Sequence, residues 1–119
     1  MTPERALPWL DDMLDAIEWI GRLTAGRTLA DYRSDRPMRD AVERNIERLS
    51  EASRHRPPEL TAAHPELPWR QIAQVGNILR HAYRRVDHAM VWEIVELDLP
   101  ALRTALEQMR AALGQQGPA

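Results

Sequence analysis

The 119-residue sequence contains no cysteine, no phenylalanine and no lysine, so all sixteen of its basic side chains are arginines. The absence of cysteine excludes disulfides, thiolate metal ligands and thiol nucleophiles. No apolar run approaches the roughly 20 residues that a membrane-spanning helix needs. The opening residues, Met1 to Arg5, lack the basic region and following apolar region of a secretory signal. We therefore expect a cytoplasmic protein.

The charge balance limits the ways in which the protein could bind a nucleic acid. The formal net charge is −2 and charged residues make up 29% of the chain, so a generally basic surface is excluded. Any contact with RNA must come from a local patch. The use of arginine alone is typical of a GC-rich genome, and it also suits paired hydrogen bonds to phosphate. Composition does not separate these two interpretations.

Apolar residues in the first half of the chain recur at helical spacing. A first helix is expected to start at Pro8 and to stop at Gly26, followed by a short segment from Leu29 to Arg33. Asp35 is placed to cap a second long helix, which should end before the two prolines at 57–58. Asn45 lies within the apolar stripe of that helix. A buried asparagine either bridges two helices by hydrogen bonds or belongs to a site, and we favour the bridge.

The second half predicts a proline-rich loop and three further helices. The loop runs from Pro57 to Pro68, and a helix follows from about Trp69 to about Val86. A shorter helix holds residues 90–95, and Asp98 is placed to cap the last one. No alternating strand pattern is present. The sequence therefore predicts an all-α, antiparallel helical bundle of four to six helices, with a single domain over residues 1–113 and a flexible tail over 114–119.

The helix predicted from about Trp69 to about Val86 is unusual because no carboxylate stands between Leu67 and Val86. At 100° per residue, its polar side chains gather on one face and its apolar side chains on the other. The polar face comprises Arg70, Asn77, His81, Arg84 and His88, with Arg80 beside them. One interpretation is a solvated face whose arginines pair with carboxylates of neighbouring helices. The other is a groove for RNA phosphates, in which a histidine moves a proton.

Residues 76–83, GNILRHAY, resemble the R-N-x-x-x-H-x-Y signature of the HepT-like toxins of the HEPN superfamily. Four other segments are similar to segments of that family. Residues 35–45 resemble D-R-x-x-x-D-A-V-x-R-N, residues 65–69 resemble P-E-I-P-W, residues 86–95 resemble V-D-x-x-x-V-W-x-I-V and residues 98–102 resemble D-L-P-x-L. Together these matches span most of the chain.

The resemblance implies a helical homodimer that acts as an endoribonuclease without a metal or cofactor and leaves a 2′,3′-cyclic phosphate. It implies a catalytic role for His81. From the polar face itself we add Asn77 and Arg80 to the catalytic group, and we expect Arg70, Arg84 and Arg85 to hold RNA phosphates. Histidine would serve as general acid or base and arginine would stabilise the phosphorane. The implied partner is a minimal nucleotidyltransferase antitoxin, which silences the toxin by adding AMP to Tyr83.

Gly76 stands where the family motif has an arginine. A glycine inside a helix costs about 1 kcal/mol relative to alanine, so we expect a second helix or a ligand to approach closely there. Restoring arginine by Gly76→Arg is expected to raise cleavage. The alternative function is a non-catalytic HEPN subunit that binds nucleotides or scaffolds the nucleotidyltransferase; a plain dimerisation module is a third. Tyr83 falls on the apolar side of an unbroken helix, so its modification requires the helix to end or bend near Ala82.

Overall fold

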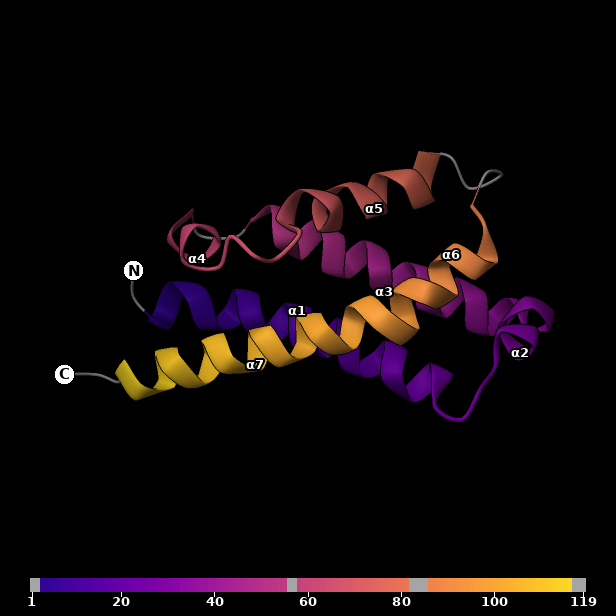
Figure 1. Ribbon diagram of the computed structural model, residues 1–119, viewed down its shortest axis with the longest axis horizontal. Coiled ribbons are helices and arrows are strands. Elements are labelled where there is room, and N and C mark those ends of the chain that lie inside the picture. Colours follow the sequence, from indigo (N-terminus) through magenta and orange to yellow (C-terminus); the bar gives the residue numbers. More distant parts are fainter. Residues whose placement is uncertain (1–2, 56–57, 82–85, 117–119) are drawn as a thin grey trace.

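The computed structural model describes residues 3–55, 58–81 and 86–116, and all regular structure in this part of the chain is helical (Figure 1). The elements are α1 (Pro3–Thr24), α2 (Leu29–Ser34), α3 (Arg36–Arg54), α4 (Pro58–Ala63), α5 (Trp69–His81), α6 (His88–Glu93), the π-helical segment η2 (Ile94–Asp98) and α7 (Leu99–Gln116). The predicted all-α fold is confirmed.

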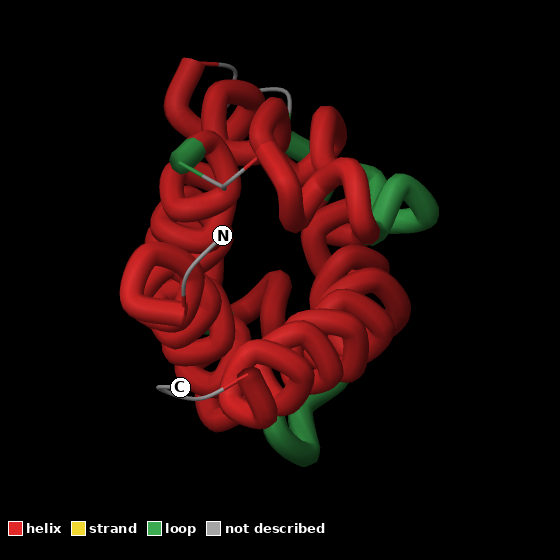
Figure 2. Tube along the Cα trace, turned by 90° about the vertical axis from the view of Figure 1, so that its left-hand side faces the viewer, coloured by secondary structure: helices red, strands yellow, loops and turns green. Residues whose placement is uncertain are grey.

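The long helices form a bundle in which α3 packs against α1 and α5, and α1 packs against α7. Figure 2 views this bundle from one end and shows the helices arranged around a common interior. The core draws Met13 and Ile20 from α1, Val42 and Ile46 from α3, and Leu106 from α7, all of them 1% exposed or less. The apolar stripes read from the sequence therefore face one another. Within the described residues, no helix is long and apolar enough to cross a membrane.

The first helix begins earlier than predicted. It starts at Pro3, so Pro8 lies inside the helix and not at its start. Pro8 removes one backbone hydrogen bond from the helix. The residues before Pro8 stay helical because Ala6 among them is fully buried in the core. The predicted stop is confirmed, because Gly26 follows the helix with a positive φ of 70°.

The helix α3 begins as predicted. Asp35 caps it by accepting a hydrogen bond from the Met38 backbone N–H at 3.0 Å. Asn45, however, does not bridge two helices. Its amide donates to the Ala41 carbonyl at 2.9 Å and its oxygen accepts from Arg48 at 3.3 Å, both within α3. The preference for an interhelical bridge was wrong because a half-buried asparagine can be satisfied by its own helix.

The proline-rich segment contains a helix that the sequence did not lead us to expect. The short helix α4 starts at Pro58, where proline costs no hydrogen bond, and Leu60 anchors it with only 5% of its surface exposed. The prediction of a continuous loop was therefore wrong. Proline marked a helix start here, and one buried leucine was sufficient to hold a single helical segment.

The last two predicted helices form one continuous rod of α6, η2 and α7 (Figure 1). Asp98 does not cap a new helix, because η2 passes directly into α7. The Leu99 N–H donates to the Ile94 carbonyl, five residues back, which is the π-helical pattern. Pro100 has no N–H to donate, and the wide turn before it lets the rod continue. Of the predicted flexible tail, residues 114–116 belong to α7, and residues 117–119 lie outside the described part.

Candidate functional site

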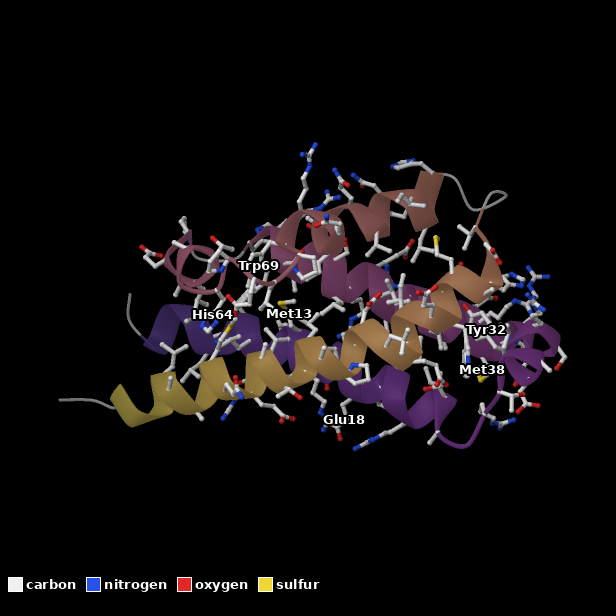
Figure 3. The ribbon with its side chains drawn as sticks, viewed as in Figure 1. Met13, Glu18, Tyr32, Met38, His64 and Trp69 are labelled. Carbon is white, nitrogen blue, oxygen red and sulfur yellow. The ribbon has the colours of Figure 1, made fainter. Side chains whose placement is uncertain are left out.

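The helix α5 presents two different faces. Trp69, Gly76 and Leu79 are buried against the bundle. The exposed surface of the helix carries Arg70, Asn77, Arg80 and His81, which we call the α5 stripe. In Figure 3 the polar side chains of α5 project away from the bundle. The predicted separation into an apolar and a basic face is confirmed for the described part of this helix.

Two members of the α5 stripe, Asn77 and Arg80, form a hydrogen bond with each other. Arg80 Nη2 donates to Asn77 Oδ1 at 2.9 Å, which holds the guanidinium on the surface of the last turn. Among the described residues, neither Arg70 nor Arg80 forms an ion pair. The interpretation as a face neutralised by neighbouring helices therefore does not describe these two arginines. They remain available to an external anion.

His88 was predicted to continue the basic face, and the structure contradicts this. The helix α5 ends at His81 in the described residues, and His88 begins the separate helix α6. Its ring meets the edge of Tyr32 at a centroid distance of 5.8 Å. The prediction failed because a chain that leaves the helical path no longer keeps its 100° spacing. The other predicted site residues of this segment, Tyr83, Arg84 and Arg85, lie outside the described residues, as does Ala82.

Gly76 faces α3 and not the α5 stripe. Its backbone N–H donates to Ser50 Oγ at 3.1 Å, and the same hydroxyl donates to the Ala73 carbonyl at 3.0 Å. A Cβ added at Gly76 would stand 2.6 Å from Ser50 Oγ and 2.8 Å from Ser50 Cβ. Of the two reasons expected for this glycine, close packing of a second helix is the one observed.

The sequence reading missed Ser50 and Arg54, which join α3 to α5. Arg54 donates from Nε and Nη2 to the Ala73 carbonyl, at 3.2 and 2.9 Å, beside the hydrogen bond from Ser50. The available signal was a small polar residue, Ser50, within the apolar stripe of its helix; that it faces a glycine of α5 follows only from the packing of the two helices. These hydrogen bonds fix the position of α5 along the axis of α3, and they therefore also position the α5 stripe.

An apolar groove of about 520 Å³ lies on the other flank of α5, between that helix and the α6–η2–α7 rod. Three of its large apolar side chains are exposed to an unusual degree: Ile78 by 45%, Met90 by 40% and Leu97 by 64%. Isolated exposed apolar residues are ordinary, but a contiguous set along a groove is typical of an interaction surface. The groove adjoins the helix that carries Asn77 and His81.

Within residues 3–55, 58–81 and 86–116, no three histidine, aspartate or glutamate side chains gather closely enough to hold a metal ion. The metal-independent reaction expected from the family resemblance stays a prediction.

Comparison with known proteins assigns the family. The model of the "Ribonuclease HepT-like" family matches residues 13–109. A "Probable ribonuclease HepT" of Thermococcus cleftensis is 36% identical over 102 residues, which cover 86% of this chain and 93% of the relative. A "Putative RNase" of Caldanaerobacter subterraneus subsp. tengcongensis is 26% identical over 86% of this chain and 91% of the relative. No solved structure matches. The chain therefore belongs to the HepT-like ribonuclease family.

Proposed function

We propose that the protein is an endoribonuclease that cleaves single-stranded RNA at the α5 stripe without a metal ion. The observation that carries the proposal is the exposed group of His81, Asn77 and Arg80 on a helix whose arginines have no carboxylate partners in the described residues. Such a surface can bind a phosphodiester, and histidine can exchange a proton near neutral pH. The test is RNA cleavage by the purified protein in EDTA, with the ends of the products identified.

The roles follow from the chemistry of each side chain. His81 acts as general acid or base in the attack of a 2′-hydroxyl on the adjacent phosphate. Arg80, held by Asn77, stabilises the charge that develops on the phosphorane. Arg70, Arg84 and Arg85 hold the RNA backbone through phosphate contacts. The products are a 2′,3′-cyclic phosphate and a 5′-hydroxyl.

The alternative is a non-catalytic subunit that binds nucleotides or scaffolds its partner. Gly76 favours it, because the motif arginine is absent and this position is directed at α3. The two functions differ in one measurable property. A catalytic protein turns over RNA, whereas a scaffold only binds nucleotide or RNA.

We infer further that the protein is the toxin of a toxin–antitoxin pair in the cytoplasm and that a minimal nucleotidyltransferase silences it by adding AMP to Tyr83. Each AMP brings a phosphate's negative charge next to Arg84 and Arg85 in the sequence. The modification would occupy those cations and repel an incoming RNA backbone. The proposal rests on the family resemblance of the GNILRHAY segment.

Incubation with the cognate nucleotidyltransferase, ATP and Mg²⁺ is expected to add one or more AMP units to the wild-type chain and none to Tyr83→Phe. Intact-protein and peptide mass spectrometry measure this. Tyr32, the other tyrosine, is an internal control because it is fully buried and its hydroxyl is out of reach in the folded protein. Equal labelling of the wild type and Tyr83→Phe would show that Tyr83 is not the acceptor.

We propose that the functional unit is a homodimer and that the apolar groove beside α5 is its interface. Leu97 is the most exposed large apolar residue of the described chain. Leu97→Glu is expected to convert the dimer to a 13.7 kDa monomer at micromolar concentration, because an interface core excludes unpaired charge. Sedimentation equilibrium measures the mass.

The matched control for the dimer is Trp19→Glu. Trp19 is 46% exposed on α1, outside the groove, so the same type of change there should leave the dimer intact. A wild-type protein that sediments as a monomer, or a Leu97→Glu variant that stays dimeric, would contradict the proposed interface.

A further inference from the structure

Arg54, the last residue of α3, reaches across to α5 at the edge of the α5 stripe. It is exposed, and its Nε and Nη2 atoms donate to the Ala73 carbonyl at 3.2 and 2.9 Å. In Figure 1 the end of α3 lies beside the start of α5, where these hydrogen bonds form. They hold a guanidinium from one helix on the surface of another.

Ala73 lies on the same side of α5 as the α5 stripe. At 100° per residue, it stands about 20° from Arg80 and about 40° from Asn77 around the helix axis. At a rise of about 1.5 Å per residue, it lies about 12 Å from His81 along that axis. Arg54 therefore borders the α5 stripe where α5 meets α3, roughly two helical turns from His81.

The guanidinium of Arg54 keeps hydrogen-bonding capacity for a ligand. Arginine carries five N–H donors in a fixed planar fork. Two of them point at the Ala73 carbonyl, and the others have no partner among the described residues. A planar fork with free donors suits paired hydrogen bonds to the oxygens of one phosphate.

No carboxylate neutralises Arg54 in the described part of the chain, because none of the ion pairs there includes it. The two preceding carboxylates of α3 have other partners. Glu51 lies 3.2 Å from His55, and Glu47 lies 3.6 Å from Arg44. The charge of Arg54 is therefore available to an anion from solution.

The packing of α5 on α3 gives only a partial reason for Arg54. The Ala73 carbonyl already accepts a hydrogen bond from Ser50 Oγ at 3.0 Å, and the helical pattern supplies the Asn77 N–H as a second donor. A carbonyl oxygen has two lone pairs, so these donors satisfy it without Arg54. What the contact adds is a guanidinium held in one orientation, which lowers the entropy cost of binding a phosphate.

Three arginines without a carboxylate partner in the described residues thus share one surface: Arg54, Arg70 and Arg80. Neighbouring charges of one sign raise the local potential that attracts an anion. The net charge of −2 does not cancel this effect, because salt screens exposed charges beyond about 8 Å. The surface is locally basic in an acidic chain.

We propose that Arg54 is a further RNA-binding residue, which holds a backbone phosphate away from the bond that is cleaved. The single-stranded RNA would then run along the α5 stripe from His81 toward the end of α3. The proposal rests on the proposed ribonuclease function and extends its substrate site to a second helix.

The test is Arg54→Gln in the binding of a single-stranded RNA whose 2′-hydroxyls are methylated, so that it cannot be cleaved. Glutamine removes the charge and keeps an N–H donor for the Ala73 carbonyl. We expect Kd to rise about fivefold at low salt. The slope of log K against log salt should lose about 0.7, the share of one phosphate contact on a single strand. Fluorescence anisotropy at several salt concentrations measures both.

The matched control is Arg48→Gln, on the same helix. Arg48 is directed at α1, where it lies 3.7 Å from Asp15. This variant should keep the wild-type Kd and the wild-type salt slope. Arg54→Lys retains a positive charge without the planar fork, so it should restore the salt slope and only part of the affinity.

Two further readouts distinguish RNA binding from a structural role. In cleavage of unmodified RNA, Arg54→Gln should raise KM about fivefold and leave kcat within about twofold of the wild type, because the contact is the same in the ground and transition states. Its Tm should stay within about 2 °C of the wild type, since Ser50 still joins the two helices.

The outcomes separate the inference from the proposed function. If Arg54→Gln keeps the wild-type Kd and salt slope while the wild type cleaves RNA, the ribonuclease stands and the role of Arg54 falls. Weaker binding with an unchanged slope and a lower Tm would also overturn the inference, because Arg54 would then only position α5. A wild-type protein that binds RNA through Arg54 and cleaves none would overturn the proposed ribonuclease but support the binding role; one that binds no RNA overturns both.

Discussion

Gly76→Arg alone is expected to destabilise the protein by about 1–3 kcal/mol or more, because the added atoms overpack a closed helix contact. The new Cβ would lie 2.6 Å from Ser50 Oγ, and Ser50 is itself only 1% exposed and bonded to the backbone of α5. The expectation that this substitution simply raises cleavage is therefore revised. A fall in Tm of roughly 5–15 °C in a thermal melt is the predicted result.

The chain offers both a rescue and a matched control for this prediction. Ser50→Gly removes the two closest atoms, so the double variant with Gly76→Arg should be more stable than Gly76→Arg alone. Gly21→Arg makes the same change where no atom lies within 4 Å of the added Cβ, and it should leave Tm almost unchanged. Equal Tm values for Gly76→Arg and Gly21→Arg would contradict the packing role of Gly76.

His81→Ala is expected to reduce RNA cleavage by about 10²–10⁴-fold, the usual contribution of a positioned acid or base. His81 is exposed at the end of α5, so the loss should come without a change in Tm. Initial rates on a labelled single-stranded RNA, with thermal melts of the same samples, measure both quantities.

The control for His81 is His55→Ala. His55 is exposed at the end of α3, where it pairs with Glu51. This variant should cleave at the wild-type rate. If cleavage survives His81→Ala, the assignment of the acid–base role to the α5 stripe is wrong.

Periodicity predicted the bundle well, because apolar spacing directly reflects which face is buried. It predicted boundaries less well, as Pro8 and Asp98 show. Both residues have strong local preferences for helix starts. The first helix nevertheless begins before Pro8, because Ala6 is buried. The last helix continues past Asp98 through the π-helical segment Ile94–Asp98. A helix cap is worth about 1 kcal/mol and a proline inside a helix costs about 3 kcal/mol, and the packing of the bundle outweighs both.

The candidate site was predictable only where it follows a single helix. Asn77, Arg80 and His81 share a face because they share α5, and the sequence alone placed them together. Arg54 comes from α3, and only the fold brings it beside the α5 stripe. The opposition of Ser50 and Gly76 is likewise a property of helix packing, which one-dimensional spacing does not contain.

The proposed RNase activity is tested most directly by the ends of the RNA that the purified wild-type protein produces in EDTA. We predict cleavage of single-stranded RNA to 2′,3′-cyclic phosphate and 5′-hydroxyl ends, because attack by the neighbouring 2′-hydroxyl needs only a proton acceptor, a proton donor and a cation. Mass spectrometry of the fragments identifies these ends. Absence of cleavage, loss of cleavage in EDTA, or products with 5′-phosphate ends would contradict it.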